Sequence, residues 1–149
     1  MDKDPFGNLR DWGPVLDQME LLAQENRLSD CQSGLIRILR YKGNWRLREE
    51  ALKCVAQIQT PCEALVFQVL DILADDNLYY DARILASDAL VRLLRCAGNG
   101  CSQDIGQELY KITEKLKSTP QPPFFNKALT RLYAEVDASA VVPLPVQGI

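Results

Sequence analysis

The chain offers few side chains for acid–base or nucleophilic catalysis. It contains no histidine, which excludes Ser-His-Asp and Cys-His nucleophile pairs and the usual histidine-containing zinc sites. Acidic residues pair at Glu49-Glu50 and Asp75-Asp76, and we interpret them as solvated surface and helix-start charge. Enzymes that excise damaged DNA bases can use an acidic side chain on a basic, DNA-binding surface. Neither of these acidic pairs lies in such basic surroundings. The sequence predicts no catalytic residue, no cofactor and no enzyme; an enzyme with an unrecognised site is the third hypothesis.

Cysteines are the other side chains with chemistry of their own. There are five, an odd number, and no two form a Cys-x-x-Cys motif: Cys31, Cys54, Cys62, Cys96 and Cys101. Four thiolates bind zinc in some proteins, but these spacings do not match a zinc ribbon, so we predict no metal site. We interpret the cysteines as reduced, mostly buried thiols. Such usage predicts a cytoplasmic or nuclear protein.

Composition limits the classes of partner. The 149 residues suit one domain, and 47% apolar with 25% charged residues is ordinary globular usage. The net charge of −3 argues against broad nucleic-acid binding, which needs many phosphate-facing cations. No apolar run reaches the length of a membrane helix, and the acidic, polar N-terminus is not typical of a secretory signal. We therefore expect a protein partner and no membrane.

Residues 35–58 and 70–93 align without a gap as two copies of one helical unit. The aligned positions lie 35 residues apart: Leu35 and Leu70, Ile38 and Leu73, Arg48 and Arg83, Ala51 and Ala86, Val55 and Leu90, Ile58 and Leu93. A period in this range is typical of helical solenoids, which present extended surfaces more often than catalytic pockets.

Apolar spacing and capping signals predict seven helices and no strand. They cover residues 14–26, 31–42, 45–59, 62–75, 78–96, 103–117 and 124–137. Capping boxes are expected at Ser29–Gln32 and Thr60–Glu63, and a cap at Ser102; prolines make 118–123 a linker. We predict an all-α, short right-handed α-solenoid of about three antiparallel helix pairs plus an N-terminal helix. Residues 1–13 form a flexible lead-in, 14–137 the repeat domain and 138–149 an uncharged tail.

The second helix of each unit carries the pattern that resembles HEAT repeats, and armadillo-like repeats more loosely. It reads Leu47-Arg48…Ala51…Val55 in the first copy and Ala82-Arg83…Ala86…Leu90 in the second. The acidic turn between the two helices of the second copy, Asp75-Asp76-Asn77, also fits. The resemblance implies a HEAT/armadillo-like fold that scaffolds other proteins, and it names no particular partner.

The segment around Trp45 is similar to the first repeat of tubulin-binding TOG domains. It reads Asn44-Trp45-Arg46-x-Arg48-x-x-Ala51-Leu52. The resemblance implies that Trp45 contacts tubulin, with Lys42 and Arg46 as the basic neighbours. Against it, a TOG domain has about six repeats, and the second turn of this chain is acidic.

Two further sets of residues recur at equivalent positions. Arg48 and Arg83 either pair with acids or carbonyls of the adjacent turn or receive an acidic peptide or a phosphate. Trp45, Tyr79 and Tyr80 lie at corresponding turns; they bind a partner if exposed and pack the solenoid edge if buried. The other aromatic residues of the helices are interpreted as packing: Tyr41, Tyr110, Phe124, Phe125 and Tyr133.

These observations favour a non-catalytic protein–protein interaction module, either an adaptor or a subunit of a larger complex. It would bind a helix or an extended peptide on its helical-repeat surface, and self-association is a further expectation. The candidate partner-binding residues are Trp45, Arg46, Arg48, Tyr79, Tyr80 and Arg83. TOG-like cytoskeletal binding through the Trp45 loop is the alternative function.

Overall fold

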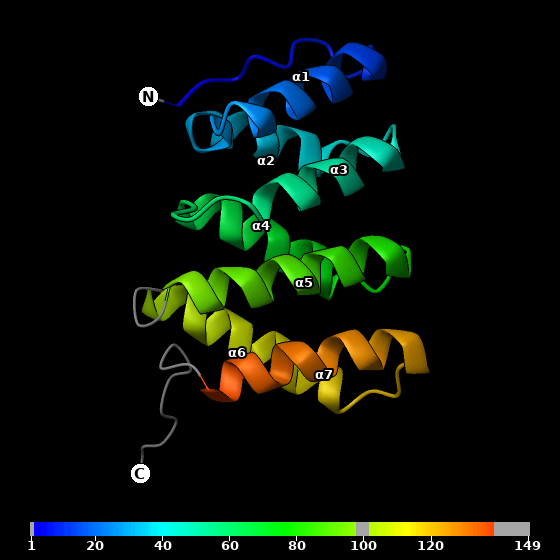
Figure 1. The fold of residues 1–149 in the computed structure, drawn as a ribbon. Helices are drawn as coiled ribbons and strands as arrows, with labels where there is room; N and C mark the ends of the chain where they lie inside the picture. Colours follow the sequence, from blue (N-terminus) through cyan, green and yellow to red (C-terminus); the bar gives the residue numbers. More distant parts are fainter. Residues whose placement is uncertain (1, 98–101, 139–149) are drawn as a thin grey trace.

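The protein is all-α (Figure 1). The computed structural model describes residues 2–97 and 102–138. Its helices are α1 (Trp12–Gln24), the short 3-10 helix η1 (Leu28–Cys31), α2 (Gln32–Arg40), α3 (Trp45–Val55), α4 (Glu63–Ala74), α5 (Tyr80–Ala97), α6 (Gln103–Lys117) and α7 (Pro123–Ala138). Within these ranges there is no strand and no helix long and apolar enough to cross a membrane. The all-α prediction is confirmed, and each predicted helix end lies within four residues of the observed one.

The helices lie in two layers, in chain order (Figure 1). The four odd-numbered helices form one layer, in which α1 contacts α3, α3 contacts α5, and α5 contacts α7. The even-numbered helices form the other layer, in which α2 contacts α4 and α4 contacts α6. All four odd-numbered helices begin at the same edge, on the right in Figure 1. That shared edge brings together residues that are far apart in the sequence.

The core between the layers is made by the repeat positions. The aligned leucines Leu35 and Leu70 are both fully buried, as are the aligned alanines Ala51 and Ala86. A fully buried leucine contributes roughly 1.5–3 kcal/mol, so the repeat that organises the sequence also supplies much of the stability. All seven α-helices contribute to one buried cluster.

Polar side chains fix where some helices begin. Asn44 caps α3, because its Oδ1 accepts hydrogen bonds from the N–H groups of Arg46 and Leu47 at 2.9 and 3.3 Å. Ser102 caps α6 as predicted, by accepting from Ile105 N at 3.2 Å. The two predicted capping boxes were wrong, since η1, α2 and α4 have no side-chain cap.

Gln32 instead joins two parts of the chain at that end. Its Oε1 accepts from the N–H of Cys62 at 2.7 Å, and its Nε2 donates to the carbonyls of Ser29 and Thr60 at 3.2 and 3.4 Å. The residue expected in a local cap therefore links the start of α2 to the start of α4.

The N-terminal segment lies against the helices, where we expected a flexible lead-in. Phe6 and Leu9 are 5% and 6% exposed. Asp4 accepts from Nε of Arg37 at 2.7 Å, and this hydrogen bond lowers the pKa of the Asp4 carboxyl. Gly34 makes room for the Phe6 ring, because a Cβ on Gly34 would lie 2.6 Å from it. The segment therefore covers one end of the stack.

Candidate functional site

Arg48 and Arg83, two of the predicted partner-binding residues, are buried inside the fold. They are 8% and 2% exposed. Arg48 donates from Nε to the carbonyl of Leu39 at 3.2 Å and from Nη2 to the carbonyl of Tyr41 at 3.0 Å. Arg83 donates from Nε to the carbonyl of Leu73 at 2.9 Å. These carbonyls lie at the ends of α2 and α4, where helices leave acceptors unpaired, so both arginines hold a helix end to the next helix.

Tyr80 packs between α5 and α7. It is half-buried, and its ring centre lies 5.4 Å from that of Phe124 and 5.1 Å from that of Phe125. The guanidinium of Arg83 lies 4.7 Å from the centre of the Phe125 ring, close enough for a cation–π contact. Tyr80 therefore serves mainly to join two helices of the odd layer.

Trp45, Arg46 and Tyr79 are at the surface. Trp45 is the first residue of α3 and is 62% exposed, while Tyr79 precedes α5 and is 36% exposed. The Tyr79 hydroxyl donates to the carbonyl of Trp45 at 3.2 Å, so the two predicted turns are in direct contact. Arg46 is exposed beside them. Of the six predicted residues, these three are exposed.

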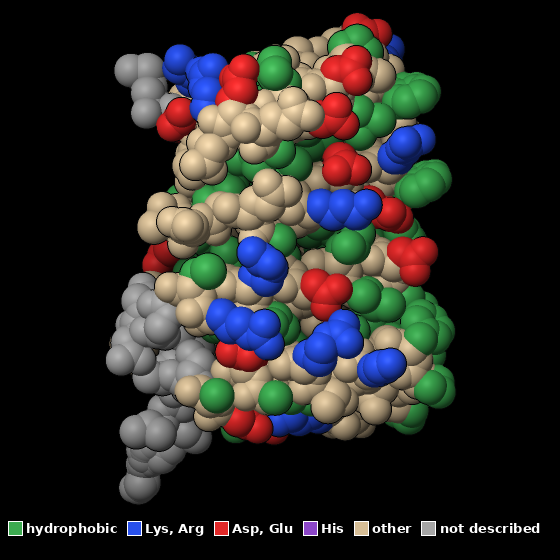
Figure 2. Space-filling view, viewed as in Figure 1, with side chains coloured by type: hydrophobic (Ala, Val, Ile, Leu, Met, Phe, Trp, Pro, Cys, Tyr) green, Lys and Arg blue, Asp and Glu red, His purple; other side chains and the backbone are tan. Residues whose placement is uncertain are grey.

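Two more exposed aromatic residues lie at the same edge. Trp12 is the first residue of α1 and is 49% exposed; Phe124 is the second residue of α7 and is 55% exposed. Together with Trp45 and Tyr79 they form what we call the aromatic edge. The described residues include one other large hydrophobic side chain that is this exposed, Leu21. Figure 2 shows hydrophobic side chains projecting along the right-hand side, where the odd helices begin.

Trp12 and Phe124 are not among the six predicted site residues. Phe124 was interpreted as packing; the structure shows that its neighbour Phe125 is the buried one, with no exposed surface. A signal for Trp12 was present, because it precedes Trp45 by 33 residues, close to the repeat period. Both tryptophans of the chain lie on the aromatic edge.

Charge along the aromatic edge varies from one helix to the next. The start of α3 is basic, with Lys42 and Arg46 exposed, and Lys127 is exposed in the first turns of α7. Neither α3 nor α7 has an acidic residue in its first turn to offset the positive end of the helix dipole. The start of α5 has Asp81 in its first turn. A bound segment that is acidic opposite α3 and α7 would complement this pattern.

We expect the Tyr79 hydroxyl to lose its proton at a higher pH than an ordinary tyrosine does. Burial, and secondly the charge of Glu49, raises the pKa of Tyr79 to about 12. Because the unfolded value is about 10, the stability that this group contributes is complete below about pH 10 and is lost as the pH rises toward 12. Ultraviolet titration of the intact protein and of Tyr79→Phe checks this. Identical titration curves above pH 10, after scaling for the number of tyrosines, would contradict the expected shift.

In residues 2–97 and 102–138, no group of three or more His, Cys, Asp or Glu residues is arranged to hold a metal ion. Cys31 and Cys54 are buried, whereas Cys62 and Cys96 are exposed. Burial raises the pKa of the Cys54 thiol to about 12, which keeps it protonated. Cys101 and residues 139–149 of the predicted tail lie outside the described residues.

Comparisons with known proteins place no further constraint on the site. No protein-family model, no curated protein and no solved structure matches the chain. The aromatic edge and the chemistry of its neighbours are therefore what indicates the function.

Proposed function

We propose that this chain is a non-catalytic protein–protein interaction module, acting as an adaptor or as a subunit of a larger complex. Its fold would be a HEAT/armadillo-like, right-handed α-solenoid of about three antiparallel helix pairs plus an N-terminal helix. The observation that carries the proposal is the aromatic edge. Four of the five large hydrophobic side chains that are exposed in the described residues gather there: three lie in the first turns of α1, α3 and α7, and the fourth, Tyr79, directly precedes α5. Exposed aromatic residues commonly supply most of the binding energy of an interface.

The proposed ligand is a peptide segment of another protein, helical or extended, that carries apolar anchors and acidic residues. The apolar anchors would cover the four aromatic side chains. The acidic residues would face Lys42, Arg46 and Lys127 and the helix starts of α3 and α7, which lack their own acids. A cytoplasmic or nuclear location, inferred from the cysteine usage, is part of the same proposal.

Site-specific photo-crosslinking tests the proposal. Benzoylphenylalanine is placed at position 45, at position 124 or, as a control, at position 21. Leu21 is 45% exposed and lies nine residues beyond Trp12 in α1, about 13 Å along the helix axis. We expect the same protein to be crosslinked in cell extract from positions 45 and 124 and not from position 21. Crosslinking that is equal at all three positions would contradict the proposal, and adducts of the chain with itself would identify self-association.

Binding to tubulin through the Trp45 loop is the second candidate. It is favoured by the 62% exposure of Trp45 and by the exposed Lys42 and Arg46 on either side of it. Asp75 and Asp76 are exposed on the neighbouring turn. Their negative charge would repel an acidic tubulin surface, which counts against this candidate. The test is co-sedimentation with tubulin. Trp45→Glu should abolish it with helicity unchanged, and an intact protein that never co-sediments would eliminate this candidate.

A further inference from the structure

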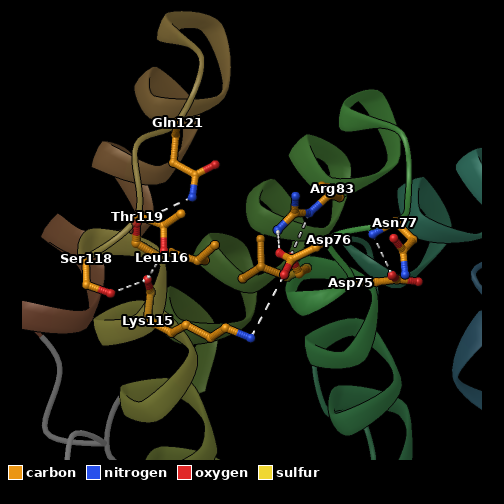
Figure 3. Close-up of polar contacts among 10 residues, drawn as sticks. Asp75, Asp76, Asn77, Arg83, Lys115, Leu116, Ser118, Thr119 and Gln121 are labelled. Atoms are coloured by element: carbon orange, nitrogen blue, oxygen red, sulfur yellow. Dashed lines mark hydrogen bonds and ion pairs between the residues drawn. The ribbon is translucent and has the colours of Figure 1, made fainter.

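A pocket opens beside the aromatic edge, between the α4–α5 turn and the segment that joins α6 to α7. Its volume is about 220 Å³. Asp76, Arg83 and Lys115 provide charged groups, and Ala74, Ile112 and Leu116 provide an apolar wall. Figure 3 shows Arg83 and Lys115 reaching Asp76 from different helices. The wall is held by the linker, because Thr119 donates to the carbonyl of Lys115 at 3.0 Å and Gln121 donates to that of Leu116 at 3.5 Å.

Arg83 has an unused donor in this pocket. Its side chain is 3% exposed, and its Nη2 has no hydrogen-bond partner among the residues that the structure describes. The nearest carboxylate oxygen, Oδ1 of Asp76, lies 3.6 Å from Nη2, beyond hydrogen-bonding distance. Buried polar groups are nearly always paired, and an exception calls for an explanation. A buried guanidinium whose positive charge is only partly neutralised attracts an anion.

The charge balance selects the type of anion. Lys115 Nζ lies 4.0 Å from Oδ2 of Asp76, and both of these side chains are 70% exposed. The two cations and the one carboxylate leave a net charge of +1, which a single carboxylate neutralises. A phosphate dianion would be repelled more strongly than a carboxylate, because Asp76 can leave Arg83 but stays on the turn that lines the pocket. Asp76 is free to move away, because most of its side chain is in solvent.

We propose that this pocket receives an aspartate or glutamate side chain of the bound partner, which displaces Asp76 from Arg83. The inference rests on the proposed interaction function and names the chemistry of the partner. The incoming carboxylate accepts a hydrogen bond from Nη2 of Arg83 and pairs with Lys115. Its neighbouring apolar residue contacts Ile112 and Leu116. While no partner is bound, the Asp76 carboxylate occupies the position that the partner's carboxylate would take.

The test uses the full chain and two short capped peptides, acetyl-Leu-Glu-Leu-amide and its glutamine counterpart. Nuclear magnetic resonance follows the Nε–H signal of Arg83 during titration. We expect a saturable shift with the glutamate peptide and at least fivefold weaker binding of the glutamine peptide. Asp76→Asn should tighten binding at least threefold, because it removes the internal competitor. Lys115→Gln should weaken binding at least threefold.

Lys111→Gln is the matched control, since Lys111 lies one turn before Lys115 on α6, is 77% exposed and does not line the pocket. Arg83 itself is left unchanged because the fold depends on it. The proposal is overturned if no saturable shift occurs, if the two peptides bind equally, or if Asp76→Asn has no effect. Tighter binding of inorganic phosphate than of acetate would overturn the assignment to a carboxylate. If the pocket fails these tests while positions 45 and 124 still crosslink a partner, the interaction function stands without this site.

Discussion

Phe125→Ala is expected to lower the free energy of unfolding by about 3–5 kcal/mol, the usual effect of removing a buried phenylalanine. Phe125 has no exposed surface. Its ring lies against the Tyr80 ring and beneath the guanidinium of Arg83, at centre distances of 5.1 and 4.7 Å. The substitution therefore leaves a cavity where α5 and α7 meet. It also removes the aromatic ring that the buried Arg83 guanidinium contacts. A loss of this size is a large part of the stability of an ordinary domain.

Phe124→Ala is the matched control, because it removes the same side chain one position earlier. Phe124 is 55% exposed, and its main contact is edge-on to Tyr80 at 5.4 Å, so we expect a loss of about 1 kcal/mol or less. Urea denaturation followed by far-ultraviolet circular dichroism measures both variants. Equal losses for the two substitutions would contradict the assignment of one phenylalanine to the core and the other to the surface.

The double variant Trp45→Ser, Phe124→Ser is expected to bind the partner at least about 100-fold more weakly. Aromatic residues that anchor an interface each contribute about 2 kcal/mol or more, and each 1.4 kcal/mol is a tenfold change in affinity. Both side chains are more than half exposed, so their loss should leave the helices intact. The partner that crosslinking identifies is purified and titrated with each variant to measure the affinity. Circular dichroism verifies the fold.

Leu21→Ser provides the control for this prediction, since it also removes an exposed apolar side chain from the odd layer. Leu21 lies away from the helix starts, so we expect an affinity within about twofold of the intact protein. If Leu21→Ser weakens binding as much as the double variant, the partner is held by general surface hydrophobicity, and the aromatic edge has no special role.

Apolar periodicity was sufficient to predict the helices, but it did not predict the environment of individual polar side chains on them. The apolar residues of the two aligned units recur at helical spacing, and all of the aligned apolar positions are buried. Arg48 and Arg83 were placed at equivalent positions by the same alignment. The sequence left two interpretations open for them, because a guanidinium can bind carbonyls or an anionic ligand. Burial shows that both arginines serve the fold, and that Arg83 also faces a pocket.

Features that depend on contacts across the chain could not be predicted. Phe6 and Leu9 are isolated apolar residues in a polar segment, so nothing in the first residues indicated that they would cover the stack. Phe124 and Phe125 are adjacent and chemically identical, and only the direction of α7 decides which of them is buried. The side chain of Gln32 was expected to cap its own helix, yet it bonds to Cys62, 30 residues away.

A three-way affinity purification from cell extract tests whether the aromatic edge holds a protein partner. The intact protein, the Trp45→Ser, Phe124→Ser variant and Leu21→Ser are used as baits at matched helicity, and the recovered proteins are quantified by mass spectrometry. We expect at least one protein to be recovered equally with the intact protein and with Leu21→Ser and to be lost with the double variant. Equal recovery of every protein with all three baits would contradict it.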